Sequence, residues 1–413
     1  MRNDDVLLDN CLKCSDCNLA CPVVKAHPAY PGPKRLGPEL ERLRREGIHC
    51  DTEWVEYCLS CDRCDLACPN QVNVSELIAR AKAAHKKPFI RKWRDFCFAR
   101  PGLLGKLGKI APEVTNFFLG SNPVRLILSK LMKITPEHTL PAYSNSPLRV
   151  PEAAANQDER IAFFPGCFIQ YNQPELGCRV LQLLQLNGFK PEVADTGCCG
   201  MPSLANGDPE EARKCAQANV NSMMEAVETG ARIVTACSSC GLMLKTGFAH
   251  MLEGDAELSK KADKIATLTF DLAELLVAQQ DTGKLNTHFA SAFARLKLAY
   301  HAPCHQKAQG IGRPWYKLLR QVPGVEIDDL NAGCCGMAGT YGFKEEKHHV
   351  SMEVGGELFA AIHASAPQAV ITECATCQMQ IEHGTGVSVI HPADILLNAY
   401  TNVPGSMPET GTM

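Results

Sequence analysis

Residues 11–22 read Cys11-Leu-Lys-Cys14-Ser-Asp-Cys17-Asn-Leu-Ala-Cys21-Pro22, and this stretch decides how the N-terminal part of the chain folds. Two, two and three residues separate its four cysteines, and proline follows the last one. The same run recurs 47 positions later as Cys58, Cys61, Cys64, Cys68 and Pro69. This doubled spacing is typical of thiolates that bind two [4Fe–4S] cubanes.

The spacing also predicts which thiols share a cluster. Three closely spaced thiolates can bind three corners of one cube, whereas the fourth cysteine of each run ligates the other cube. We therefore expect a first crossed set of Cys11, Cys14, Cys17 and Cys68. We expect a second crossed set of Cys58, Cys61, Cys64 and Cys21. Zinc is the alternative, but structural zinc sites use two separated ligand pairs, which leaves the third cysteine of each run without a role.

Composition narrows the class of protein. The chain has 413 residues, 22 cysteines and 45% hydrophobic residues, which is enough for two or three domains with their own cores. Its N-terminus lacks the features of a signal peptide, and no apolar run approaches the 18 residues of a membrane span. We expect a cytosolic protein whose cysteines bind metal rather than form disulfides. The formal net charge of −3 argues against nucleic acid as a partner.

The segment after the cysteine runs differs in kind. Residues 86–157 are rich in proline, which predicts only short elements. Within 86–133, eleven lysines and arginines stand against Asp95 and Glu113, a balance of +9, and aromatic residues and leucines are interleaved. This pattern favours a membrane surface or an acidic partner. The alternative is a linker whose apolar residues pack back on the main domain.

The remainder of the chain repeats itself. Cys167, Gly197-Cys-Cys-Gly200 and Cys237-Ser-Ser-Cys240 recur 136 or 137 positions later as Cys304, Gly333-Cys-Cys-Gly336 and Cys374-Ala-Thr-Cys377. A constant period of this size predicts two homologous lobes. Apolar strand-like runs alternate with helical patterns in each lobe, for example 161–164 with 176–186 and 369–372 with 345–362. This alternation predicts parallel α/β lobes whose cysteines follow strand ends.

We therefore expect an α+β multidomain chain, in which an N-terminal helical two-cluster ferredoxin module precedes two homologous α/β Cys-Cys-Gly lobes. The expected units are the module (1–85), a basic linker (86–157), the first lobe (158–288), the second lobe (289–402) and a disordered tail (403–413).

Each lobe contains five cysteines in its repeated motifs. The first-lobe set is Cys167, Cys198, Cys199, Cys237 and Cys240, and the second-lobe set is Cys304, Cys334, Cys335, Cys374 and Cys377. Five thiols exceed what zinc binds, so we expect one or two further iron–sulfur clusters, not necessarily cubanes. Buried or regulatory cysteines are the alternative.

Several single residues carry expectations of their own. Gly200 and Gly336 are expected to let the backbone approach a bulky centre. His305 is expected to be a structural histidine, with a cluster sulfur or a quinone as alternative partners. The remaining cysteines are expected to be ordinary buried residues: Cys50, Cys97, Cys178 and Cys215. The second lobe is expected at the far end of a relay that begins at the cubanes.

The chain resembles a known family over residues 8–402. Its lobes look like the B subunit of heterodisulfide reductase, in which such a five-cysteine set binds a noncubane [4Fe–4S] cluster. The order of its modules is similar to the iron–sulfur subunits of glycolate oxidase and of anaerobic glycerol-3-phosphate dehydrogenase. Four stretches favour the C subunit of the latter: Tyr30-Pro-Gly-Pro-Lys34, Gly166-Cys-Phe-Ile-Gln-Tyr-Asn172, Cys334-Cys-Gly-Met-Ala-Gly-Thr-Tyr-Gly-Phe343 and Cys374-Ala-Thr-Cys-Gln-Met-Gln-Ile381.

That resemblance implies a role. Flavin-containing subunits A and B would oxidise sn-glycerol 3-phosphate, and this chain would pass the electrons to menaquinone at the cytoplasmic side of the inner membrane. No Gly-x-Gly-x-x-Gly follows a strand, so the chain itself shows no flavin or dinucleotide fingerprint. The alternatives are a glycolate or lactate oxidase subunit, a heterodisulfide-reductase-like enzyme, and a non-redox zinc or scaffold protein.

Overall fold

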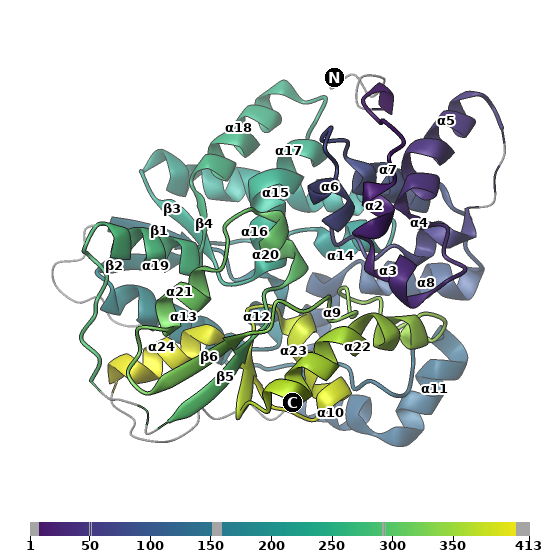
Figure 1. Ribbon diagram of the computed structural model, residues 1–413. Helices are drawn as coiled ribbons and strands as arrows, with labels where there is room; N and C mark the ends of the chain where they lie inside the picture. The colour runs from purple at the N-terminus through teal and green to yellow at the C-terminus, as the bar shows by residue number, and fades with distance from the viewer. Residues whose placement is uncertain are drawn as a thin grey trace.

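The computed structural model describes residues 8–48, 50, 52–150, 159–290, 293 and 295–401. It contains an N-terminal helical module followed by two lobes with parallel sheets, as the sequence predicts (Figure 1). The tail expected at 403–413 lies outside the described residues.

The N-terminal module is built from short helices, because the cysteine loops interrupt its chain repeatedly. Its longest helix, α7, follows the second cysteine run, and its buried residues Val74 and Ile78 pack in the core of the module. The elements of the module are α2 (Asp16–Leu19), α3 (Pro22–Ala26), α4 (Gly32–Lys34), η1 (Arg35–Glu39), α5 (Leu40–Arg45), η2 (Glu53–Tyr57), α6 (Arg63–Leu66) and α7 (Val74–Ala84).

Four helices follow the module in the chain and form a helical layer that packs on the lobes: α8 (Phe89–Phe98), α9 (Pro101–Gly108), α10 (Pro112–Gly120) and α11 (Asn122–Met132). Prolines begin these helices rather than dissolve them, because a proline in the first helical turn has no hydrogen bond to lose. One face of the layer packs inward. Phe98 is buried, and Leu128 and Met132 pack against the core of the second lobe.

Each lobe contains a four-stranded parallel sheet with the same strand order. The first sheet has the order β2-β1-β3-β4 and the second has the order β6-β5-β7-β8. The first-sheet strands are β1 (Glu159–Phe163), β2 (Phe189–Val193), β3 (Arg232–Thr235) and β4 (Thr269–Asp271). The second-sheet strands are β5 (Leu296–Tyr300), β6 (Val325–Asp329), β7 (Ala369–Ile371) and β8 (Val389–Ile390). In both sheets the direction of strand addition reverses beside the first strand, which is where open α/β sheets bind ligands.

Helices connect the strands and cover the sheets. In the first lobe they are α12 (Gly166–Tyr171), α13 (Pro174–Leu186), α14 (Met201–Ala205), α15 (Pro209–Glu228), α16 (Ser238–Leu242), η3 (Met243–Gly247), α17 (Phe248–Met251), α18 (Ala256–Thr267) and α19 (Leu272–Asp281). In the second lobe they are α20 (Cys304–Ala308), α21 (Pro314–Leu319), α22 (His348–Ser365), α23 (Ala375–Thr385) and α24 (Pro392–Thr401).

The two lobes share one hydrophobic core. Helix α13 of the first lobe packs on α24 of the second, and α21 of the second lobe packs on α19 of the first. A single cluster of buried side chains runs from Ile161 in β1 to Tyr400 in α24 and includes Trp315. Each lobe therefore completes the burial of the other, and the two cysteine-bearing sheets are held in a fixed relation.

Candidate iron–sulfur sites

The N-terminal module brings the cysteines together in crossed combinations. Cys21 lines one small cavity, of about 20 Å³, with the three cysteines of the second run, and Cys68 lines another of about 20 Å³ with the three cysteines of the first run. Burial, Cys61 and Cys58 raise the pKa of Cys21 to about 12. Burial, Cys11 and Cys14 raise the pKa of Cys17 to about 11. All 22 cysteines are free thiols, so the donor set of both cavities fits iron–sulfur clusters.

The loops around these two cavities share an uncommon backbone conformation. Lys13 and Ser15 in the first loop have φ angles of 60° and 78°, and Ser60 and Asp62 in the second loop have φ angles of 51° and 56°. Such positive angles are rare for residues with a side chain, and surrounding structure must hold them. Their recurrence 47 positions apart indicates that both loops are shaped around the same kind of centre.

The first-lobe set forms a continuous series of sulfur contacts. The thiols of Cys198 and Cys240 hydrogen-bond Cys199 and hold its pKa well below the ordinary value. Cys198 also contacts Cys167, and Cys240 also contacts Cys237. These contacts help to raise the pKa of Cys198 and of Cys240 well above the ordinary value. All five predicted thiols of this lobe therefore meet at one place.

The second-lobe set repeats this arrangement. Cys304 and Cys335 hydrogen-bond Cys334 and hold its pKa well below the ordinary value. The sulfur of Cys335 lies 3.1 Å from that of Cys377, which also contacts Cys374 and helps to lower the pKa of Cys374 to about 6. The order of contacts matches that of the first lobe, so the repeat extends to the geometry of the sulfurs.

The second-lobe set also reaches the N-terminal module. The thiol of Cys304 hydrogen-bonds Cys334 and also Cys61, a member of the second crossed set. The expectation that the second lobe lies at the far end of a relay is therefore wrong. Position in the sequence does not set position in space here, because α22 of the second lobe packs directly against α3 of the module.

The two Cys-Cys-Gly glycines serve helix packing. Gly200 and Gly336 have φ angles of +87° and +89°. A Cβ atom on Gly336 would lie 2.0 Å from the carbonyl oxygen of Ser351 in α22, and one on Gly200 would lie 3.1 Å from that of Ala212 in α15. These glycines let a long helix approach the cysteine loop, so the close contact is with a helix backbone rather than with the centre itself.

His305 links the cysteine loops of three parts of the chain. Its Nδ1 lies 2.8 Å from the hydroxyl of Ser239, between the cysteines of the first-lobe Cys237-Cys240 pair. Its Nε2 lies 2.8 Å from the carbonyl oxygen of Ser60, between Cys58 and Cys61. A carbonyl oxygen only accepts, so Nε2 donates. Both ring nitrogens are satisfied by protein, which agrees with a structural histidine.

The four cysteines without motif partners were expected to be buried, but they are not. Cys50, Cys97, Cys178 and Cys215 are all partly exposed. The sulfur of Cys178 accepts a hydrogen bond from the backbone N–H of Arg149 and donates to the carbonyl oxygen of Pro147. An apolar residue type predicts burial only on average, so single positions can differ.

A large apolar cavity of about 580 Å³ lies where the helical layer meets both lobes. Its walls include Leu104 and Leu119 of the layer and Met379 of the second lobe. Thiols from both lobes also line it, among them Cys167, Cys199, Cys237, Cys240 and Cys374. The hydroxyl of Thr372, also in the wall, is buried without a hydrogen-bond partner. A cavity that is mostly apolar with few polar groups is typical of a small-molecule site, and clusters bound to these thiols would occupy part of its volume.

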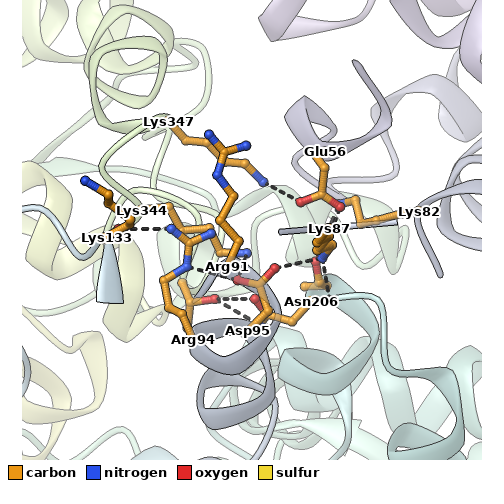
Figure 2. A network of polar contacts seen from close by, with 12 residues as sticks. Glu56, Lys82, Lys87, Arg91, Arg94, Asp95, Lys133, Asn206, Lys344 and Lys347 are labelled. Atoms are coloured by element: carbon orange, nitrogen blue, oxygen red, sulfur yellow. Dashed lines mark hydrogen bonds and ion pairs between the residues drawn. The ribbon is translucent and has the colours of Figure 1, made fainter. Parts of the chain in front are cut away.

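A buried ionic network joins the module, the helical layer and the second lobe (Figure 2). Asp95 of α8 binds Lys87 at 2.7 Å, Lys344 at 2.8 Å and Arg94 at 3.1 Å. Glu56 of the module binds Lys87 and Lys347, each at 3.1 Å. Burial alone would raise the pKa of Glu56, but Lys347 and Lys87 hold it at about 2.

This network contains more basic than acidic side chains, although burial holds the pKa of Lys344 well below its usual range and lowers that of Lys347 to about 8. Its cations are Lys82, Lys87, Arg94, Lys344 and Lys347, and its anions are Glu56, Asp95 and Glu346. Lys82 donates to the carbonyl oxygen of Cys58 at 2.9 Å, so the excess lies beside the second crossed set. Buried charge is costly unless it is compensated. Four thiolates bound to iron carry net negative charge, which would supply the compensation.

No pattern in the sequence signals this network. Its members are ordinary lysines, one arginine and carboxylates, spread from residue 56 to residue 347, and only the folded chain brings them together. One expectation must be corrected because of it. Arg94 counted toward the basic surface of residues 86–133, but its side chain is fully buried and binds Glu346 through two hydrogen bonds of 2.8 Å.

The outer face of the helical layer is apolar as well as basic. Among the described residues, thirteen of the nineteen exposed large apolar side chains lie between Phe89 and Leu131. Lys92, Lys106 and Lys130 are exposed on the same helices. A linker that packs back on the main domain would bury these side chains, so the packing alternative explains only the inner face. No helix in the described part of the chain is long and apolar enough to cross a membrane.

Comparison with known proteins agrees with this organisation. The 4Fe-4S dicluster domain matches residues 7–72, and the cysteine-rich domain CCG matches residues 161–245 and 298–382. The chain is 36% identical to the C subunit of anaerobic glycerol-3-phosphate dehydrogenase of Escherichia coli (strain K12), over 96% of this chain and 99% of that protein. It is 25% identical to the B subunit of fumarate reductase (CoM/CoB) of Methanothermobacter marburgensis, over 97% of this chain and 74% of that protein. It is 29% identical to lactate utilization protein A 2 of Bacillus cereus (strain Q1), over 57% of this chain and 97% of that protein.

Proposed function

Because this chain belongs to the family of the C subunit of anaerobic glycerol-3-phosphate dehydrogenase and is an iron–sulfur electron-transfer subunit, we propose that it carries electrons from flavin-containing subunits to menaquinone. The substrate oxidised by those subunits is sn-glycerol 3-phosphate. The chain itself supplies the carriers and the quinone site, and the flavin partners perform the hydride chemistry.

A continuous path of sulfur atoms supports this role most directly. In the proposal, the first and second crossed sets bind two [4Fe–4S] cubanes, and each lobe set binds a further iron–sulfur cluster. Cys61 of the second crossed set contacts Cys304 of the second-lobe set, and Cys374 of that set lines the apolar cavity. When bound, the clusters supply one-electron carriers, and the protein contributes their spacing and burial.

The apolar cavity suits the acceptor. Menaquinone combines a ring that bears two carbonyl groups with a long apolar tail. Leucine and methionine side chains of the wall fit the ring and tail, and the unpartnered hydroxyl of Thr372 can donate to a quinone carbonyl. His305, although it lines the cavity, has both nitrogens engaged and is assigned to holding the loops together.

The helical layer is proposed to dock the protein on the membrane. It forms part of the cavity wall, and its outer face exposes aromatic rings, leucines and lysines. Such helices can lie in the headgroup region of anionic lipid. Docking through this face would bring the cavity to the membrane surface, where the quinone tail partitions.

Purified complex, co-expressed with its flavin subunits, tests the electron path. Cys335→Ala is expected to abolish reduction of a water-soluble menaquinone analogue while dye-linked oxidation of glycerol 3-phosphate continues. Cys178→Ser is the matched control, because Cys178 belongs to none of the sulfur series, and it should leave both activities unchanged. Quinone reduction at the normal rate in Cys335→Ala would refute the path through the second lobe.

A disulfide substrate is the second candidate, because thiols of both lobes face one cavity. A heterodisulfide-reductase-like enzyme would reduce a disulfide at these clusters in the isolated chain. Assay of the isolated chain with a disulfide and a reduced dye separates the two candidates. Replacement of glycerol 3-phosphate by lactate or glycolate in the assembled complex tests the other flavin partners.

A further inference from the structure

A group of histidines lies apart from the sulfur sites, on the second lobe. Glu137 precedes His138 in the loop after α11, His348 begins α22, and His383 lies in the last turn of α23. One ligand atom from each of Glu137, His348 and His383 lies within 4.8 Å of the other two. Three separate elements therefore converge on one point.

The protein fixes these side chains in an arrangement suited to a metal ion. Nδ1 of His348 lies 3.3 Å from the carbonyl oxygen of Gly342, which can only accept, so Nδ1 donates this hydrogen bond. Nε2 of His348 points at Glu137 and lies 2.7 Å from a carboxylate oxygen, which is hydrogen-bonding distance. A histidine that donates one nitrogen to a backbone carbonyl and presents the other is the usual arrangement of a metal ligand.

The surroundings orient the third ligand. The ring of His138 lies with its centre 3.9 Å from that of His383 and 5.2 Å from that of His348. His138 is almost fully buried, and its Nε2 has no hydrogen-bond partner. Arg125 lies close enough to oppose a cation, but its guanidinium also donates to the carbonyl oxygen of Pro136. Glu137 and His383 are exposed, so an ion can enter from solvent.

We propose that Glu137, His348 and His383 bind one divalent transition-metal ion, of which Zn²⁺ fits best, with water in the fourth position. Two imidazoles and one carboxylate form a ligand set that zinc uses with an open position. Without an ion, Nε2 of His348 and the carboxylate of Glu137 are within hydrogen-bonding distance, and the metal ion would take the place of the shared proton.

The ion would fasten the loop at 134–140 to two helices of the second lobe. The backbone already begins this attachment, since Thr135 donates to the carbonyl oxygen of Phe343 at 2.8 Å. Ile134, Leu140 and Phe343 line the apolar cavity. Metal binding would thus make one wall of that cavity more rigid, although the site itself does not depend on what the cavity binds.

Zinc uptake by the cluster-loaded, full-length protein tests the proposal. The protein is stripped with a chelating resin that leaves its iron content unchanged, then titrated anaerobically with Zn²⁺ alone and desalted. One tightly bound zinc ion per chain is expected, with an X-ray absorption spectrum that contains nitrogen and oxygen ligands at about 2.0–2.1 Å and no sulfur at about 2.3 Å.

Variants separate this site from adventitious binding. His383→Gln changes an exposed ligand and is expected to weaken zinc binding more than tenfold, as is Glu137→Gln. His349→Gln is the matched control, because His349 neighbours His348 but is 83% exposed and pairs with Glu353 instead. Equal uptake by His383→Gln and His349→Gln, a sulfur-containing spectrum, or no bound zinc in the unaltered protein would each overturn the proposal.

Discussion

Replacement of Asp95 by asparagine would remove the carboxylate at the centre of the buried ionic network. Asp95 is only 4% exposed and contacts three cations within 3.1 Å. Although burial opposes it, Lys344, Lys87 and Arg94 hold the pKa of Asp95 well below its usual range. Asparagine keeps the size of the side chain but leaves the cations without this counter-charge. Removing one partner from a buried ion pair costs about 3–5 kcal/mol.

The expected loss can be measured as a lower thermal midpoint. A cost of about 3–5 kcal/mol corresponds to about 6–10 °C, taking about 2 °C per kcal/mol for a large chain. Circular dichroism of the cluster-loaded protein under anaerobic conditions gives the midpoint. Asp281→Asn is the control, because its 2.7 Å pair with Lys317 is about half exposed and is worth less than about 1 kcal/mol. Equal midpoints for Asp95→Asn and Asp281→Asn would refute the view that the network fastens the module, layer and second lobe together.

The same network predicts how stability depends on pH. The folded-state pKa values of Asp95 and Glu56 lie below the unfolded values of about 4. Their contribution is therefore complete above about pH 5 and is lost as pH falls toward the value of about 2 for Glu56. Asp95→Asn should show a smaller loss of stability over that acid window than the unaltered protein. Iron content must be followed in parallel, and an identical acid profile in both proteins would contradict the assignment.

Three further outcomes are expected. Cys21→Ser should damage the cluster bound by Cys58, Cys61 and Cys64 more than its own neighbour in sequence, and electron paramagnetic resonance that resolves both cubanes would show the reverse if the ligation is not crossed. Gly336→Ala should destabilise by at least about 2 kcal/mol because of its positive φ and the clash with Ser351, whereas Gly339→Ala, with φ of +65° and open space, should cost about 1 kcal/mol by the same thermal assay. Replacement of Lys92, Lys106 and Lys130 by glutamate should weaken binding to anionic vesicles by at least about 100-fold, since each basic residue contributes about 1 kcal/mol. The same change at the exposed residues Lys260 and Lys264 on α18 should have no effect. Equal binding by both variants would show that the layer is not the lipid contact.

Most of the predictions that the structure confirms came from the spacing of the cysteines. Ligand chemistry demands fixed spacings, so the runs at 11–21 and 58–68 and the repeat of 136 or 137 residues were enough to predict the module, the two lobes and the grouping of thiols. The alternation of strand-like and helical runs predicted the parallel sheets for the same local reason. Such patterns can be recognised in the sequence because each depends on residues that are close together along the chain.

What could not be predicted depends on contacts between distant segments. Arg94 looked like one more surface charge because nothing near it in sequence reveals Glu346. His305 flanks a cysteine, yet its partners Ser60 and Ser239 come from two other parts of the chain. The contact between Cys61 and Cys304 could not be inferred either, since they lie 243 positions apart and are brought together by the packing of α22 on α3 and of α20 on α6.

The core shared by the two lobes has a consequence for how the protein is made. While the ribosome is still translating the second lobe, α13 and α19 lack the second-lobe helices that cover them, because α24 and α21 lie later in the chain. The nascent first lobe would therefore expose apolar surface until the second lobe has been synthesised. Stable folding of the first lobe is therefore expected only after its sister has been synthesised, so the two lobes are expected to fold together even though the first-lobe cysteines appear early in the sequence.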